Sequence, residues 1–156
     1  RNAKSGIIVK GLHDLAVRFS KCCSPVPGDE IVGFVTRGRG ITIHRTDCIN
    51  VLNLPEIERS RLIDAEWQGV EEDNSAATYS TEISIFANNR IGMFVDISKI
   101  FTEREIDIKA KSSRVNKQGK ATITMSFDIH GIEELNNLMA KLRQIDGVLD
   151  IERTTG

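Results

Sequence analysis

Cysteine is scarce in this sequence, long apolar runs are missing, and neither sign of charge dominates. The three cysteines are an odd number and two of them are adjacent, which argues against a disulfide framework because adjacent cysteines pair only with a strained geometry. No apolar run approaches the length of a bilayer-spanning helix and no signal peptide is visible, so we expect a cytoplasmic protein without a membrane partner. A formal net charge of -1 excludes a strong overall field toward nucleic acid or membrane.

A start methionine is also absent, since the sequence opens with RNAKSG, and we expect a piece of a longer protein. Its 156 residues suffice for one medium domain or two small ones. Residues 1–55 hold eight Lys/Arg and four Asp/Glu, whereas residues 56–78 hold two Arg and seven Asp/Glu. Within the acidic part, the polar stretch QGVEEDNSAAT has the composition of a linker. We therefore predict a domain over 1–67, a linker over 68–78 and a second domain over 79–156.

The second domain shows a regular succession of strand and helix patterns. Strands are predicted at 79–88, 106–115, 121–130 and 147–153, and helices at 91–105 and 132–145. In the second strand, Ile106, Ile108 and Ala110 are expected to share the buried face. The order is βαββαβ, which predicts an α+β fold of the ferredoxin-like kind. In it, both helices cover one face of a four-stranded antiparallel sheet.

The first domain is shorter and more interrupted by turns, and we predict a small α/β or β-rich module. Strands are predicted at 29–36, 40–45 and 61–67, and a further one is compatible with 13–20. The stretch TDCINVLNL predicts a short helix with Thr46 or Asp47 as its N-cap.

Three thiols and one imidazole lie within this first domain. Cys22, Cys23, His44 and Cys48 form a ligand set that suits tetrahedral zinc. The first pair is C-C and not C-x2-C, so the turn CCSPVPGD must aim both side chains at one ion. A packed cluster without metal, a disulfide and a catalytic Cys–His pair are the alternatives, and the last lacks a third residue to orient the histidine. A position near a helix N-terminus is expected to lower the pKa of Cys48.

A glycine-rich turn, TRGRG, carries Arg37 and Arg39, and Arg45 follows on the next predicted strand. Arginines on a glycine-rich hairpin can neutralise RNA phosphates, because glycine lets the backbone approach closely. A solvated turn with incidental charge is the alternative. Neither Arg37 nor Arg39 stands next to an aromatic residue, so stacking on bases is not indicated.

Two stretches of the sequence resemble known families. NRIGMFVDISKIF, within a βαββαβ unit, is similar to the first turn of ACT domains, and Asn89, Arg90, Gly92, Met93 and Asp96 fall on the family pattern. The preceding stretch resembles the conserved-cysteine module of long Rel/SpoT-type enzymes, which make and hydrolyse the alarmone (p)ppGpp. The matching residues there are Cys22, Cys23, Pro25, Gly28, Asp29, Gly33, Gly40, His44, Arg45 and Cys48.

The resemblance implies a regulatory and non-catalytic role. In this family the GTP pyrophosphokinase and hydrolase domains lie N-terminal to such a module. The cysteine module, also described as zinc-finger-like, and the ACT domain contact ribosomal RNA near the A-site finger. The same region relays nutritional state to the catalytic domains of the parent protein. ACT domains generally bind amino acids at a homodimer interface, and some relatives bind branched-chain ones. The alternative function is a redox or zinc switch built on the cysteine cluster.

An amino acid at the ACT turn would meet two kinds of group. Free amides at a helix N-terminus suit its carboxylate, and asparagine side chains suit its amine. An apolar gap beside Met93 and the strand of Ile106 and Ile108 would take its side chain. The predicted ligand-binding residues are Asn88, Asn89, Arg90, Ile91, Gly92, Met93, Ile106 and Ile108. Asn89 stands where the family usually has Asp, and Met93 where it has Leu.

Overall fold

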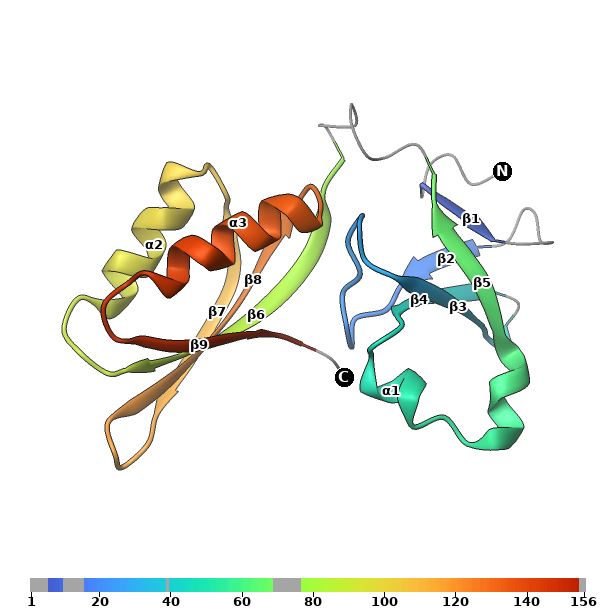
Figure 1. Cartoon of the computed structure of the whole chain (residues 1–156), viewed down its shortest axis with the longest axis horizontal. Coiled ribbons are helices and arrows are strands. Elements are labelled where there is room, and N and C mark those ends of the chain that lie inside the picture. The colour runs from blue at the N-terminus through green and yellow to red at the C-terminus, as the bar shows by residue number, and fades with distance from the viewer. Residues whose placement is uncertain (1–5, 10–15, 39, 69–76, 155–156) are drawn as a thin grey trace. The chain divides into compact units, whose positions relative to one another are not determined.

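A computed structural model of the chain describes residues 6–9, 16–38, 40–68 and 77–154, and these form two compact units (Figure 1). The first unit ends at Ala77, and the second spans Thr78–Thr154. Most of the predicted linker lies outside the described residues. None of the described helices is long and apolar enough to cross a membrane.

The first unit is a five-stranded sheet with two short helical segments. Its strands are β1 (Ile7–Val9), β2 (Ala16–Phe19), β3 (Ile31–Val35), β4 (Gly40–Arg45) and β5 (Leu62–Trp67). The strand order is β1-β5-β3-β4-β2, in which β2 runs parallel to β4 and the other neighbours are antiparallel. The helix α1 (Ile49–Leu52) and the 3-10 helix η1 (Glu56–Arg61) connect β4 to β5. The predicted strands at 29–36, 40–45 and 61–67 are confirmed, whereas β1 and η1 were not predicted.

One face of this sheet holds the main core of the first unit. The side chains buried there come from β1 and β4, namely Ile7, Val9, Ile41 and Ile43. Phe19 of β2 and Trp67 of β5 stack beside this cluster with ring centroids 5.6 Å apart, although two strands separate β2 from β5. The sheet therefore curls around its core. Gly33 permits close packing at the centre, because a Cβ there would lie 3.0 Å from side-chain atoms of both Ile41 and Ile63.

The second unit confirms the predicted βαββαβ order. Its elements are β6 (Tyr79–Asn88), α2 (Met93–Glu103), β7 (Ile108–Val115), β8 (Lys120–Ile129), α3 (Ile132–Arg143) and β9 (Val148–Arg153). The antiparallel sheet has the order β7-β8-β6-β9. Both helices cover the same face of the sheet (Figure 1), which gives the ferredoxin-like architecture.

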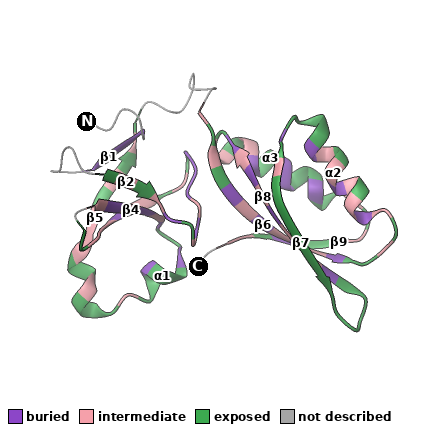
Figure 2. Cartoon of the chain, turned by 180° about the vertical axis from the view of Figure 1, so that it is seen from behind, coloured by how far each residue is buried: buried purple, intermediate pink, exposed green. Residues whose placement is uncertain are grey.

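Apolar residues at strand and helix spacing build one continuous core between this sheet and its helices. Figure 2 shows buried and half-buried positions alternating along β6 and β8. The largest fully buried side chains of this unit are Phe101, Phe127, Ile83, Ile85, Ile97, Met125, Ile129, Leu135 and Leu138. Phe101 of α2 meets Phe127 of β8 edge to face, with centroids 5.0 Å apart. The predicted periodicity of β8 and of both helices is therefore correct.

The predicted alternation in β7 is wrong at Ala110. The register of β7 against β8 shifts between Ile108 and Ala110, so Ala110 pairs with Ser126 and is exposed. Ile106 is buried but precedes the strand. A β-bulge inserts one residue and moves the following side chains to the other face, which a strict period of two cannot anticipate.

Candidate functional site

The parallel pairing of β2 with β4 assembles the cysteine site. The carboxyl ends of parallel strands meet at the same edge of a sheet. The segment that carries Cys22 and Cys23 follows β2 directly, and His44 lies near the end of β4. The amide of Ser20 extends this pairing by donating to the carbonyl of Ile43 at 2.9 Å. Cys48 lies in the turn after β4, immediately before α1.

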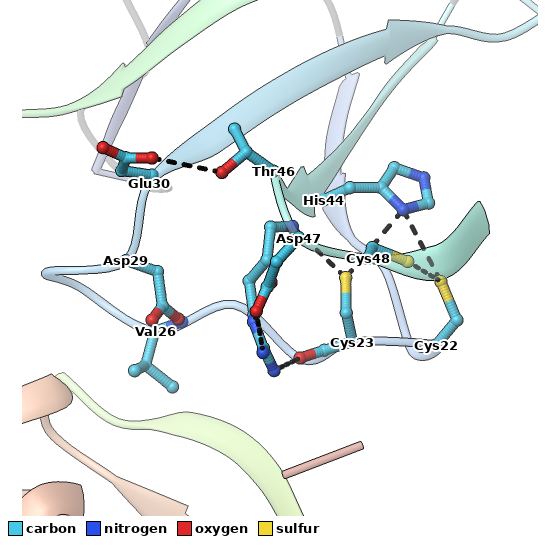
Figure 3. A network of polar contacts seen from close by, with 10 residues as sticks. Cys22, Cys23, Val26, Asp29, Glu30, His44, Thr46, Asp47 and Cys48 are labelled. Carbon is cyan, nitrogen blue, oxygen red and sulfur yellow. Dashed lines mark hydrogen bonds and ion pairs between the residues drawn. The ribbon is translucent and has the colours of Figure 1, made fainter. Parts of the chain in front are cut away.

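Figure 3 shows the three sulfurs and the imidazole converging. The Cys22 Sγ lies 3.3 Å from the Cys48 Sγ and 3.5 Å from the His44 Nδ1. The Cys23 Sγ lies 3.9 Å from the same nitrogen, and all four donor atoms lie within 4.8 Å of one another. All three cysteines are free, so a structural disulfide is absent from the described cluster.

These distances fit the edges of a zinc coordination tetrahedron. Zn–S bonds of about 2.3 Å and Zn–N bonds of about 2.0 Å place the sulfurs ~3.8 Å apart and each sulfur ~3.6 Å from the nitrogen. The observed separations of 3.3, 3.5 and 3.9 Å scatter around those values. Soft thiolates with one imidazole are also the donor set that zinc prefers. These three distances and the donor chemistry are therefore compatible with a zinc ion.

Burial shifts the pKa values of two thiols and of the imidazole in the direction that favours their neutral forms. Removal from water raises the pKa of the Cys23 thiol to about 12 and also raises the pKa of Cys48, and it lowers the pKa of His44. The prediction of a lowered pKa for Cys48 is wrong, because burial outweighs the dipole of a helix of only four residues. Cys48 is itself the N-cap of α1, and neither Thr46 nor Asp47 caps the helix by its side chain.

Cys22 differs from its neighbours in both exposure and hydrogen bonding. Burial raises the pKa of its thiol, but hydrogen bonds to Ser20, Asn50 and the other thiols outweigh burial and lower that pKa. The Ser20 Oγ lies 2.8 Å from the Cys22 Sγ and also accepts the Cys22 amide at 3.2 Å. Cys22 is thus the partly exposed thiol of the cluster, whereas Cys23 and Cys48 are buried. The sequence reasoning missed Ser20, although a serine two residues before a candidate ligand was visible in it.

Arg45 supports the cysteine site from within the fold. Its guanidinium donates to the Cys23 carbonyl at 3.1 Å and to both carboxylate oxygens of Asp47 at 2.9 and 2.8 Å. Its backbone amide donates to the Cys23 Sγ at 3.2 Å. Only 6% of Arg45 is exposed, so its predicted place on an RNA-facing surface is wrong. A buried guanidinium that is hydrogen-bonded inside the protein has little capacity left for a phosphate.

The basic hairpin between β3 and β4 is exposed at its tip. The Arg37 side chain is 82% exposed, and its nearest acidic partner is Glu58 at 3.7 Å. A Cβ added at Gly38 would meet no described atom within 4 Å. The Thr36 Oγ1 closes the hairpin by exchanging hydrogen bonds with the backbone of Gly40 at 3.1 Å. Arg39, the second predicted RNA contact, lies outside the described residues.

The ACT turn between β6 and α2 is built by Gly92. Its φ of 84° lies in the left-handed region, which glycine adopts without a steric penalty. The amide of Met93 donates to the Arg90 carbonyl, and no described group accepts from the amides of Ile91 and Gly92. Asn88 accepts a hydrogen bond from Lys120 at 2.9 Å. The turn thus offers two backbone donors.

Arg90 is occupied within the fold. Its guanidinium donates twice to the carbonyl of Asp146 at 3.0 and 2.9 Å and once to the Asp96 carboxylate at 2.8 Å. A fourth bond reaches the Ile91 carbonyl at 3.1 Å. The Asp146 carbonyl belongs to the loop before β9, so Arg90 joins this loop to the ACT turn. This role differs from the predicted contact with a ligand.

The structure does not bring all predicted ligand-binding residues together in one chain. Asn88 pairs with Lys120 at one end of β8, whereas Ile108 pairs with Phe127 near the other end. Seven residues of extended strand separate the two partners by about 23 Å. The Asn88–Met93 turn and the apolar pair Ile106 and Ile108 therefore lie at opposite ends of the sheet.

Each of the two units matches a known domain family. Residues 7–68 match the RelA/SpoT RIS domain, and residues 75–153 match the ACT domain. The chain is 36% identical over 151 residues to the GTP pyrophosphokinase of Escherichia coli K12, which covers 96% of this chain and 20% of that protein. It is 32% identical over 154 residues to the GTP pyrophosphokinase of Streptomyces coelicolor, covering 99% of this chain and 18% of that protein.

A solved structure is similar to the second unit. The ACT domain from the GTP pyrophosphokinase of Chlorobium tepidum has 25% sequence identity and a TM-score of 0.44, covering 49% of this chain and 99% of that one. The chain spans about a fifth of the length of the full-length relatives it matches.

Proposed function

The chain belongs to the RelA/SpoT family, with a RIS domain followed by an ACT domain, and we propose that it is the non-catalytic regulatory segment of a GTP pyrophosphokinase that makes or hydrolyses (p)ppGpp. The observation that carries this proposal is the match of both domains, in this order, to about a fifth of enzymes named GTP pyrophosphokinase. Its partners would be the ribosome and the catalytic domains of the same parent protein.

The direct test compares the full-length parent with a form that lacks these 156 residues. We expect both to retain basal activity, and only the full-length protein to respond to ribosomes stalled by amino-acid starvation. A truncated form that responds equally well would exclude a regulatory role for this segment.

Zinc binding by the cysteine site is part of the proposal. Cys22, Cys23, His44 and Cys48 would hold the ion, and it would crosslink the end of β2 to the turn before α1. The ligand distances and the donor chemistry support this. Metal analysis of the purified chain is expected to give about one zinc per molecule. A chain without metal and with three freely titratable thiols would favour a packed cluster instead.

We propose that the β3–β4 hairpin contacts ribosomal RNA through Arg37, and that Arg39 adds a second contact. The exposed side chain of Arg37 and the open space around Gly38 support this role. Replacing both arginines with glutamate is expected to weaken ribosome association and to make the residual binding less salt-dependent, because fewer counterions are released. Lys99→Glu on α2 is a control that reverses a charge on the other unit. Unchanged co-sedimentation with ribosomes across a salt series would refute the contact.

The ACT turn is proposed to bind a small apolar amino acid. The amides of Ile91 and Gly92 would donate to the carboxylate, and the exposed side chain of Asn89 would meet the amine. Since Ile106 and Ile108 lie at the far end of the sheet, a homodimer would have to supply the apolar wall. Ligand and dimer would then stabilise each other.

Calorimetry with valine, leucine and isoleucine tests this site. Asn89→Asp restores a negative charge beside the amine and is expected to tighten binding, whereas Thr124→Ala on the opposite face of the sheet is expected to change nothing. Gly92→Ala is a poor test of binding, because the left-handed φ of 84° would strain any alanine there. If none of the three amino acids produces heat on mixing, the domain is an interaction module without an amino-acid ligand.

A redox switch is the second candidate, and one distance favours it. The Cys22 and Cys48 sulfurs lie 3.3 Å apart, and the more exposed Cys22 has the lowered pKa. Hydrogen peroxide could take two electrons and two protons from these thiols, which would form one S–S bond and two water molecules. Mass spectrometry after mild peroxide treatment should then find a Cys22–Cys48 crosslink, and zinc should block it. Absence of this crosslink in the metal-free chain would eliminate the switch.

A further inference from the structure

Ser20 lies where the pairing of β2 with β4 ends and the cysteine-bearing turn begins. Only 8% of this residue is exposed. Its amide donates to the Ile43 carbonyl of β4, and its own carbonyl accepts the amide of Ser24 at 2.9 Å. The sheet thus holds one backbone group of Ser20 and the turn holds the other. The Ser20 side chain therefore starts from a fixed point beside the cysteine site.

The Ser20 hydroxyl contacts Cys22 in two ways. Its Oγ accepts the Cys22 amide at 3.2 Å and lies 2.8 Å from the Cys22 Sγ. An amide can only donate, so the hydroxyl keeps its own hydrogen for the sulfur. Zinc binds cysteine as the thiolate, which has no hydrogen and can only accept. With zinc bound, the Ser20 hydroxyl is therefore the donor of this pair.

The sulfurs of a zinc site gain from such donors. Three thiolates and a neutral imidazole carry more negative charge than a divalent ion neutralises. Hydrogen bonds to the thiolates spread this excess charge, and a bond to an anion is about twice as strong as a neutral one. The Cys23 Sγ accepts from the Arg45 amide at 3.2 Å, which is a backbone donor that no substitution except proline removes. Cys22 differs, because its donors are the side chains of Ser20 and Asn50.

We propose that Ser20 is a positioning residue of the zinc site, whose hydroxyl holds the Cys22 thiolate toward the ion and lowers its reactivity. Cys22 is the partly exposed ligand, so protons and electrophiles from solvent reach it before the buried Cys23 and Cys48. A hydrogen bond withdraws electron density from the sulfur lone pair, which slows its attack on an electrophile. Ser20 thereby sets how readily the zinc crosslink between β2 and α1 opens. This role rests on the zinc site proposed above.

Cobalt(II) substitution in the whole chain tests this role by spectroscopy. Cobalt bound to thiolates absorbs in the near ultraviolet as charge moves from sulfur to metal. Ser20→Ala is expected to shift this band to lower energy, because loss of the hydrogen bond raises the energy of the sulfur lone pair. Ser20→Thr keeps the hydroxyl and should retain the wild-type band. A merely structural contact would leave the band of folded Ser20→Ala in place.

Thr46→Ala is the matched control. Thr46 stands two residues before Cys48, as Ser20 stands two residues before Cys22, but its hydroxyl donates to Glu30 at 3.3 Å. Its removal should leave both the cobalt band and the zinc affinity unchanged. Circular dichroism verifies that each variant folds.

Zinc affinity and alkylation measure the consequence for the site. In a competitive titration, Ser20→Ala is expected to bind zinc about tenfold more weakly, as for other residues that orient metal ligands. Iodoacetamide should alkylate Cys22 faster in zinc-loaded Ser20→Ala than in the wild type. The thiolate forms a C–S bond, iodide leaves, and the thioether releases the zinc to a chromophoric chelator. Peptide mass spectrometry should find Cys22 modified before Cys23 and Cys48.

Asn50→Ala provides a second variant, at an exposed position where folding is not at risk. It removes the other side-chain donor to Cys22 and should shift the cobalt band in the same direction. A folding defect in Ser20→Ala would therefore still leave the effect of hydrogen bonds on Cys22 measurable.

An unshifted cobalt band in folded Ser20→Ala would overturn the proposal, and so would an equal shift in Thr46→Ala. If Ser20→Ala does not fold, an unshifted band in Asn50→Ala overturns it. Failure of the zinc site itself looks different. A wild-type chain that takes up neither cobalt nor zinc refutes the site and the role of Ser20 with it. A chain that binds both metals and keeps its band in every variant refutes only the role of Ser20.

Discussion

The first unit buries four aliphatic side chains in its curled sheet and adds a separate cluster around Cys23, Cys48 and Val51, whereas the second unit buries one continuous layer between a sheet and two helices. The second unit thus has the larger apolar core, and its stability follows from ordinary hydrophobic burial. The first unit has few large apolar side chains to bury, and the thiols of Cys23 and Cys48 fill part of its interior. The difference indicates that the first unit depends on its thiols, and on zinc when zinc is bound, far more than the second does.

Removal of the zinc that we propose for the cysteine site is expected to have the largest effect on this difference. Structural zinc sites contribute an apparent ~10–16 kcal/mol in small metal-dependent folds at neutral pH. We expect a chelator to lower the melting temperature of the first unit steeply and to leave the second unit unaffected. Differential scanning calorimetry of the whole chain, with and without chelator, should show one transition that moves and one that stays. Coincident shifts of both transitions would contradict the independence of the units.

Truncation of the second core is the converse test. Phe127→Ala removes a fully buried ring that contacts Phe101. The cavity is expected to cost about 3–5 kcal/mol in the free energy of unfolding of the second unit alone. Urea denaturation, followed by hydrogen exchange at amides of each unit, measures this. Zinc content should remain unchanged, and a loss of zinc would show that the two folds are coupled.

Arg45→Met is expected to have an intermediate effect, confined to the first unit. It removes the hydrogen bonds to the Cys23 carbonyl and to Asp47 from a buried position, at a cost of about 2–3 kcal/mol. Zinc affinity should fall with it, because Arg45 holds the backbone that positions Cys23. The urea midpoint and a competitive zinc titration are the measurements. Lys21→Met, on an exposed side chain next to Cys22, is the control that should leave both values in place.

The smallest effect concerns alkaline pH in the metal-free chain. Burial raises the pKa of Cys23 to about 12 in the folded state, so the unfolded thiol ionises first as pH rises. The folded state binds more protons in this window, and its stability therefore decreases from about pH 9 upward. Urea midpoints between about pH 7 and 10.5 should decline with the native cysteines, and less steeply in Cys23→Ala, where only the raised pKa of Cys48 still contributes. A stability that increases with pH would contradict the burial of this thiol.

The sequence was sufficient for the second unit because its local signals agree with its packing. Strict alternation in β8 and helical spacing in α2 and α3 each indicated the buried face directly. The predicted alternation in β7 failed because of a β-bulge, at which the register shifts by one residue. The sequence offers no strong local signal for it, since IDIKAK alternates without interruption.

The cysteine site could be predicted as a set of residues but not as an arrangement. Residue types alone indicated Cys22, Cys23, His44 and Cys48, yet the parallel pairing of β2 and β4 that joins them is a long-range feature. Arg45 was misplaced for a related reason. In sequence it follows the glycine-rich turn, and only the strand register shows that its side chain lies against the backbone of Cys23. Charge patterns thus identify arginines without showing which of them remain exposed.

The bond from Arg90 to the Asp146 carbonyl spans 56 positions of the chain, and this has a consequence for synthesis. The first turn of the ACT unit cannot take its final form until almost the entire unit has left the ribosomal tunnel. Gly147 adds to this, since a Cβ there would lie 2.9 Å from the Met93 side chain, so the late loop must close tightly over the early turn. The turn that we propose as the amino-acid site would therefore stay incomplete until the loop before β9 has emerged.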